Sequence, residues 1–184
     1  RYARLMYKKK WNKLTVSPGV SFNSYTLNGA GDARENSQYV FPELRALYEF
    51  GGSHSLELDY RQSIEYNDVA AYSEGYVMSR YNTLLFGNAG LSPALSHAVG
   101  VNYRNYNMYN FFNIYGGLNF TYIVDGFTNN QQLQGVENVL TPVNAGSANH
   151  ITSGYLNLEK RFDHFRVSGQ VHLSHTVLNN QMEN

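Results

Sequence analysis

Three features of this sequence predict an all-β fold, a transmembrane antiparallel up-and-down β-barrel of which about eight strands are present. Apolar and polar residues alternate with a period of two, which is the period of a β-strand. The connections between these segments are alternately short and long along the chain. Charged side chains keep to one phase of the alternation, and aromatic residues gather beside the short connections, as in barrels that cross a bilayer.

The alternation is clearest in HSLELDYRQSIEY, residues 54–66. One phase of this segment is apolar apart from Gln62, and the other phase carries four charged residues. Such a segment predicts a strand with one apolar and one polar face. The same pattern predicts further strands, which bring the total to about eight with no helix. They cover residues 1–7, 13–29, 40–50, 96–104, 110–125, 153–162 and 164–178.

The connections between these segments are of two kinds. Short connections are expected near 8–12, 51–53, 104–109 and 162–164, and long ones at 28–38, 67–95, 126–149 and after Leu178. Outer-membrane barrels have tight periplasmic turns at one end and longer extracellular loops at the other. The connections therefore favour such a barrel, in the bacterial outer membrane.

The overall composition excludes several classes of protein. Fourteen basic residues balance fourteen acidic ones, so nothing indicates a nucleic-acid partner. Cysteine is absent, which excludes disulfides, thiol nucleophiles and thiolate metal sites within these residues. No stretch of 18 apolar residues predicts a transmembrane helix, and the start of the chain shows no signal-peptide pattern.

The two phases lead to an assignment of faces. A basic residue facing lipid at the membrane midplane costs about 2–4 kcal/mol, so the charged phase is expected to face a wet lumen. The polar candidates for the lumen are Glu43, Arg45, Glu57, Asp59, Arg61, Asn102, Arg104, Asn119, Glu159 and Arg161. The residues expected to face lipid are Leu56, Leu58, Tyr60, Val99, Val101, Tyr103, Leu118, Phe120 and Val171. The competing interpretation is a soluble barrel or sandwich with its apolar face turned inward.

Strand parity makes a further prediction about the extent of the chain. If the turn at 8–12 is periplasmic, the first and the eighth strand both reach the extracellular side. Complete outer-membrane barrels usually begin and end in the periplasm. Residues 1–184 are therefore expected to be one domain, a partial barrel belonging to a larger one, with no plug domain in this chain.

Two segments carry a resemblance to a known family. GNAGLSPALSHAVGVNYR, residues 87–104, resembles a segment of the TonB-dependent receptor barrels of Bacteroidota, the SusC-like proteins, in which a long loop ends in G-N-P-x-L-K-P-E-x-S before a strand. The matching positions are Gly87, Asn88, Leu91, Pro93, Ser96 and Tyr103. Ala89, Ser92 and Ala94 depart from the pattern. Residues 41–64 are similar to the hairpin that precedes it, and the match covers about 39–125.

This resemblance implies a barrel of about 22 strands, with a plug domain and a TonB box that the present residues do not show. It implies partners as well: outer-membrane lipids, a surface lipoprotein, the plug and TonB. The expected function is the binding or import of a solute at the cell surface. The alternative is a structural barrel subunit, without transport, of an outer-membrane assembly or secretion complex.

No catalytic or metal-binding pattern emerges from the sequence. His172 and His175 are three residues apart on a predicted strand, so they point to opposite faces and cannot chelate one ion together. An outer-membrane enzyme would need a nucleophile and a base, for which Ser92, Ser96 and His97 are the one nearby set. We therefore expect no enzyme, no cofactor and no metal site.

Overall fold

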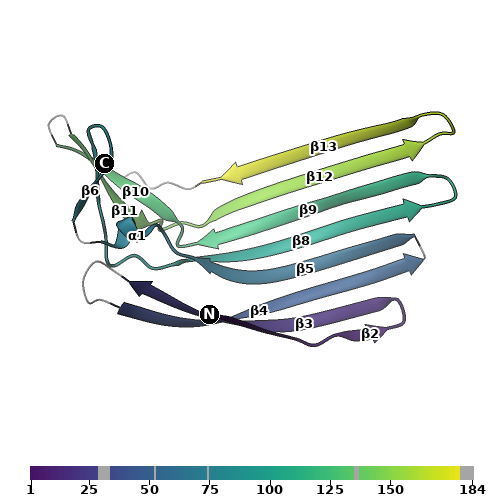
Figure 1. Ribbon diagram of the computed structural model, residues 1–184, viewed down its shortest axis with the longest axis horizontal. Coiled ribbons are helices and arrows are strands. Elements are labelled where there is room, and N and C mark those ends of the chain that lie inside the picture. The colour runs from purple at the N-terminus through teal and green to yellow at the C-terminus, as the bar shows by residue number, and fades with distance from the viewer. Residues whose placement is uncertain (29–33, 52, 74, 135–136, 179–184) are drawn as a thin grey trace.

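The computed structural model describes residues 1–28, 34–51, 53–73, 75–134 and 137–178. Within them the chain forms a large antiparallel sheet and a small sheet at one end of it (Figure 1). The large sheet has the strand order β1-β3-β4-β5-β8-β9-β12-β13, in which each strand pairs with its neighbour along the sheet, and β2 pairs with β3 beyond the end of β1. Eight adjacent strands therefore confirm the up-and-down order that the sequence predicts.

The strands of the large sheet are long. Their bounds are β1 (Tyr2–Met6), β2 (Lys9–Trp11), β3 (Leu14–Asn28), β4 (Arg34–Gly51), β5 (His54–Glu65), β8 (Ala94–Asn107), β9 (Phe112–Val124), β12 (Asn149–Arg161) and β13 (Arg166–Val177). At about 3.3 Å per residue, a tilted strand needs 9–11 residues to cross a bilayer. From β3 onward, each strand of this sheet meets that length.

Tight turns join the strands at one end of the large sheet, on the right in Figure 1. Asn12 and Phe111 take positive φ values of 51° and 50° in two of these turns. In the turn between β8 and β9, the Asn107 side chain accepts hydrogen bonds from the backbone N–H of Tyr109 and Asn110, at 2.9 and 3.2 Å. This turn is shorter than predicted, because the β8 ladder continues to Asn107.

The long connections predicted at 67–95 and 126–149 lie at the opposite end of the sheet, but they contain strands and a short helix that the sequence did not predict. They form helix α1 (Val69–Tyr72) and strands β6 (Tyr76–Arg80), β7 (Thr83–Phe86), β10 (Phe127–Gln134) and β11 (Glu137–Asn144). These strands make a second sheet with the order β10-β11-β7-β6. β4 also begins at Arg34, so the connection expected at 28–38 is shorter; residues 29–33 and 179–184 lie outside the described residues.

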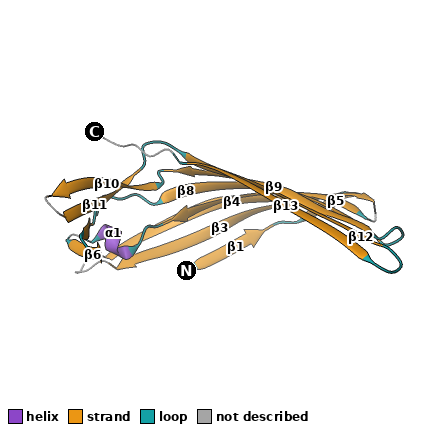
Figure 2. Ribbon diagram, turned by 90° about the horizontal axis from the view of Figure 1, so that it is seen from above, coloured by secondary structure: helices purple, strands orange, loops and turns teal. Residues whose placement is uncertain are grey.

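The large sheet is a single layer when it is viewed along its edge (Figure 2). Most of the buried apolar residues lie in or beside the small sheet and α1, where they form a compact core: Ala71, Leu91, Ala94, Val139, Pro142 and Ala145. In the large sheet the buried apolar side chains among the described residues are Phe41 and, at the start of β8, Ala94; the buried Ser21 lies directly opposite Phe41. The hydrophobic core of a soluble sandwich is therefore not seen within the large sheet.

Helices contribute little to this structure. Among the residues that the structure describes, α1 is four residues long, and no helix is both long and apolar enough to span a membrane.

Candidate functional site

The register of the large sheet sorts the candidate residues into two faces. Glu43 lies opposite Arg61, Arg45 opposite Asp59, and Glu57 opposite Asn102. Successive residues of a strand point to opposite faces, so all ten predicted polar residues lie on one face, which we call the polar face. All nine residues expected to contact lipid lie on the other face, the apolar face. The structure thus groups each set as the phase predicts.

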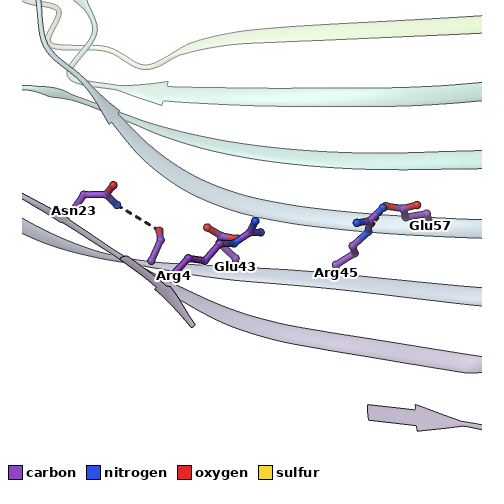
Figure 3. A network of polar contacts seen from close by, with 6 residues as sticks. Arg4, Asn23, Glu43, Arg45 and Glu57 are labelled. Carbon is purple, nitrogen blue, oxygen red and sulfur yellow. Dashed lines mark hydrogen bonds and ion pairs between the residues drawn. The ribbon is translucent and has the colours of Figure 1, made fainter. Parts of the chain in front are cut away.

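Ion pairs join neighbouring strands on the polar face. Arg45 of β4 pairs with Glu57 of β5, and Arg4 of β1 reaches past β3 to Glu43 of β4 (Figure 3). The Glu43 side chain is 14% exposed and the Glu57 side chain 26%, so both carboxylates are partly withdrawn from water and each has a guanidinium partner. These ion pairs connect β1 with β4 and β4 with β5 on the polar face.

A hydrogen-bonded chain crosses the middle of the same face. The Tyr155 hydroxyl donates to Asn102 Oδ1 at 2.7 Å, and Asn102 Nδ2 donates to Asp59 Oδ1 at 3.5 Å. Two glycines make room for this chain. A Cβ at Gly117 would lie 2.7 Å from the Tyr155 hydroxyl, and a Cβ at Gly100 would lie 2.5 Å from Asp59 Oδ1.

Tyr155 is a polar-face residue that the candidate set lacks. Its phase was visible in the sequence, but its role depends on Gly117, which lies directly opposite it in the ladder between β9 and β12. A large residue opposite a glycine is a signal that can be read only after the register is known.

Removing the Tyr155 hydroxyl is expected to have a small, local effect. Tyr155→Phe loses one partly buried hydrogen bond and leaves an acceptor on Asn102, which should lower the free energy of unfolding by about 1 kcal/mol. Equilibrium unfolding in detergent checks this, with Tyr122→Phe on the apolar face as the control. Equal stability of the two variants would contradict a role for the bond.

The apolar face is exposed rather than packed. Along β9 and β12, Leu118 is 63% exposed and Leu156 41%. The exposure continues onto the outer strands of the sheet. Phe22, Val40, Val167, Val171 and Leu173 are each at least half exposed. A continuous apolar surface of this extent is not expected to face water.

Two histidines of the apolar face are paired with tyrosines. His54 Nδ1 lies 2.9 Å from the Tyr103 hydroxyl, and His97 Nδ1 lies 3.0 Å from the Tyr60 hydroxyl. The pairs are separated by six residues on each of β5 and β8, about 20 Å along the strands. Each imidazole therefore has a hydrogen-bond partner on a face that otherwise offers few polar groups.

The segment that carries the family resemblance fastens the two long connections together. Asn144 Oδ1 accepts from the Ser92 N–H at 2.8 Å, while its Nδ2 donates to the carbonyls of Ser92 and Asp125 at 2.8 and 2.9 Å. Asn88 Nδ2 donates to the Pro142 carbonyl at 3.1 Å. β11 also pairs in parallel with β7, so both connections share one sheet. We call this set of contacts the loop clasp.

Loss of the Asn144 side chain should loosen the loop clasp. Asn144→Ala removes three hydrogen bonds to backbone groups, so the docked loops are expected to lose about 1–3 kcal/mol of stability. Hydrogen exchange at the Ser92 amide should accelerate, whereas substitution of the exposed Asn129 of β10 should leave it unchanged. Unaltered exchange in the Asn144 variant would show that the parallel pairing alone holds the loops.

The enzyme candidates are not brought together. Ser96 lies on the polar face of β8 and His97 on its apolar face, where it contacts Tyr60. Ser92 is exposed, and its backbone is bound by Asn144. Over the described ranges, no three histidine, aspartate or glutamate side chains are grouped as metal ligands. The polar face, with its ion pairs and hydrogen-bonded chain, is the candidate site.

Comparison with known proteins gives the family. A model of the outer membrane protein beta-barrel family matches residues 3–182, nearly the whole chain. The chain belongs to this family. No curated protein matches the sequence. Membership places this β-barrel protein in the bacterial outer membrane.

Solved structures agree in fold with this β-barrel protein. It superposes on the FrpB iron transporter of Neisseria meningitidis (F5-1 variant) with a TM-score of 0.67 at 14% identity, covering 95% of this chain and 25% of that one. The siderophore receptor PirA of Acinetobacter baumannii gives 0.66 at 14%, covering 94% and 27%. The hemophore receptor HasR of Serratia marcescens, solved with its hemophore HasA and heme, gives 0.66 at 14%, covering 97% and 33%.

These neighbours are described as an iron transporter, a siderophore receptor and a hemophore receptor. The chain spans about a quarter to a third of their length, so the likeness concerns one part of a barrel wall.

Proposed function

We propose that this chain forms part of the membrane-spanning wall of a TonB-dependent-type receptor that binds or imports a solute at the cell surface. The observation that carries the proposal is the exposed apolar face of the large sheet, combined with the paired charges of the opposite face. A soluble sheet would bury its apolar face, whereas a wall in lipid exposes it.

In this proposal the polar face lines the lumen and the apolar face contacts outer-membrane lipid. The ten polar candidates then face a wet interior, where an ion pair such as Arg45–Glu57 costs little. The tight turns lie on the periplasmic side, and the small sheet with the loop clasp covers the extracellular mouth.

The wall is proposed to be part of a larger barrel. β1 and β13 are open edges of the large sheet, and open edges in hydrocarbon leave backbone groups unpaired at several kcal/mol each. Further strands must therefore pair with both edges, in a barrel of about 22 strands. The resemblance of the sequence of residues 87–104 supports the proposed assignment to the SusC-like branch of Bacteroidota.

The solute and the partners follow from the same proposal. The structural neighbours are described as carriers or receptors of iron, siderophore, copper and heme-loaded hemophore, so metal chelates are a first set of solutes to test. A plug domain in the lumen, TonB in the periplasm and a lipoprotein on the surface are the proposed protein partners, together with outer-membrane lipids.

Cysteine labelling can test the two faces, because these 184 residues contain no cysteine. In the full-length protein in cells, a cysteine at Asp59 or Arg61 should react with a small charged thiol reagent. A cysteine at the neighbouring Leu58 or at Val99 should react with a lipophilic maleimide instead. Reaction of the Leu58 and Val99 variants with the charged reagent would overturn the membrane assignment.

Uptake measurements separate transport from the structural alternative. Cells that express the full-length protein should accumulate a bound solute in a manner that depends on the proton motive force. An inserted barrel that binds no solute and supports no uptake would favour a structural subunit of an outer-membrane assembly or secretion complex.

A further inference from the structure

The apolar face is hollowed over its last four strands. A cavity of about 490 Å³ lies among β8, β9, β12 and β13, which are adjacent strands in Figure 1. Two apolar-face residues in its lining, Gly116 and Gly154, have no side chain, and Leu118, Leu156 and Leu173 surround them. The volume falls within the range of about 300–1,000 Å³ that is usual for small-ligand sites. We call this cavity the glycine hollow.

The two glycines keep the glycine hollow open. A Cβ at Gly116 would lie 3.2 Å from Leu156 Cδ1, and a Cβ at Gly154 would lie 3.0 Å from Leu118 Cδ2. A side chain at either position would therefore occupy part of the cavity or push a leucine into it. The leucines are exposed, with Leu118 at 63% and Leu173 at 71%. An occupant of the hollow must therefore be apolar.

Polar residues at the two ends of β12 indicate where the glycine hollow lies in the bilayer. On the apolar face this strand carries His150 at the small-sheet end and Lys160 at the tight-turn end. The ten positions between them span about 33 Å along the strand, or about 25 Å across the membrane at a tilt of about 40°. The apolar band of outer-membrane barrels has this height. Lys160 therefore lies at the level of the lipid headgroups.

Lys160 brings a positive charge to that level. Its Nζ donates to the Asn110 carbonyl and lies 5.8 Å from the centre of the Phe162 ring. The neighbouring Glu159 lies on the polar face, where it pairs with Arg166 at 2.6 Å, so its carboxylate does not neutralise Lys160. A lysine ammonium at the membrane interface attracts an anionic headgroup.

An apolar path joins Lys160 to the glycine hollow. Leu158 and Ile114 lie directly opposite each other between them. Along β12, Leu156 is four residues and Gly154 six residues from Lys160, so the hollow lies about 10–15 Å deeper in the bilayer than Lys160. One leaflet of a 25 Å band is about 12 Å deep. A lipid with its headgroup at Lys160 therefore reaches the hollow with the end of an acyl chain.

We propose that the apolar face binds one anionic glycerophospholipid of the periplasmic leaflet, with its phosphate at Lys160 and an acyl chain in the glycine hollow. This inference rests on the proposed function, which puts the apolar face in lipid and the tight turns on the periplasmic side. It goes beyond a general contact with lipid, because a charge and a cavity lie one leaflet apart on the same strand.

Photolabelling of the full-length protein in vesicles tests the inference. The vesicles are phosphatidylcholine with a small fraction of phosphatidylglycerol that carries a diazirine near the end of one acyl chain, and the labelled peptides are sequenced. Label should concentrate on residues 116–118 and 154–156. Phosphatidylcholine with the same diazirine should label these residues about fivefold less, since one lysine near a membrane surface contributes about that factor.

Matched variants separate the charge from the cavity. Lys160→Gln and Gly154→Val should each lower the phosphatidylglycerol label on residues 116–118 about fivefold, whereas Lys160→Arg should retain it. Lys9→Gln is the control for charge, because Lys9 lies on the same face at the same end of the sheet. Ala46→Val is the control for bulk on the apolar face of β4. Neither control should change the label, and heat-modifiable migration on gels shows that each variant is folded.

The outcomes that contradict the phospholipid site differ from those that contradict the proposed function. Equal labelling of the glycine hollow by the two lipids, or unchanged labelling in Lys160→Gln, would show that Lys160 selects no headgroup. Label spread evenly over the apolar face would show that the hollow holds no particular chain. In these cases the lipid has still reached the apolar face, so the proposed function stands. Absence of label from the whole apolar face would contradict the membrane assignment itself.

Discussion

Leu118→Arg is expected to destabilise the folded wall in a bilayer by about 2–4 kcal/mol. Leu118 lies near the middle of β9 on the apolar face and is 63% exposed, so the guanidinium would replace a side chain that faces hydrocarbon. The measurement is the free energy of unfolding of the full-length barrel in lipid vesicles, followed by tryptophan fluorescence. Cells should also show less of the variant in the outer membrane.

Asn119→Arg is the matched control for this substitution. Asn119 is the next residue along β9 and belongs to the polar face, where an added cation meets water and carboxylates. Its stability should change by no more than about 0.5 kcal/mol. If the two arginines had equal effects, or if Leu118→Arg were neutral, the apolar face would not be in contact with lipid.

Gly87→Ala is expected to disrupt the packing of the long loops. A Cβ at Gly87 would lie 2.0 Å from the Ser73 carbonyl oxygen and 2.9 Å from that of Ala70, so backbone rather than a flexible side chain would have to move. Asn88, the next residue, donates its backbone N–H to the Ala71 carbonyl at 2.7 Å and would be displaced too. The docked loops should lose about 3 kcal/mol.

Limited proteolysis of the intact protein measures this effect. Cleavage within residues 67–93 should become much faster in Gly87→Ala, while the barrel keeps its heat-modifiable migration on gels. Gly169→Ala on β13 is the control, because a Cβ there meets no atom within 4 Å. Wild-type resistance of the Gly87 variant would mean that the loops tolerate the shift.

The strands of the large sheet and its two faces could be predicted from the sequence, because the period of two can be read within each strand. Directly paired residues of neighbouring strands lie on the same face, so the same phase continues across the sheet. The eight charged lumen candidates, from Glu43 to Arg161, fall in one phase, and the ladders place them on one face, whereas Lys160 at the end of β12 falls on the other. Their exposure to a lumen stays a prediction. The motif at 87–104 also marked the point where the loop clasp forms.

The second sheet could not be predicted in the same way. β7 has four residues and pairs with β11 across more than fifty positions of sequence, which leaves no local period to recognise. The position of the Tyr155 side chain likewise depends on the absence of a side chain at Gly117 in the neighbouring strand. In both cases the decisive contact lies outside any sequence window, and only the register of the sheet reveals it.

The parallel pairing of β7 with β11 has a consequence for the order in which the chain folds. Leu85 of β7 pairs with Leu140 of β11, and the hairpin of β8 and β9 brings the two long connections to the same end of the large sheet. A contact between residues so far apart in sequence has a large loop-closure entropy cost. This cost falls once the strands between the two residues have paired, so such contacts tend to form late. The small sheet should therefore form after the large sheet. The two long connections would then cross the bilayer unfolded, and β6, β7, β10 and β11 would pair afterwards.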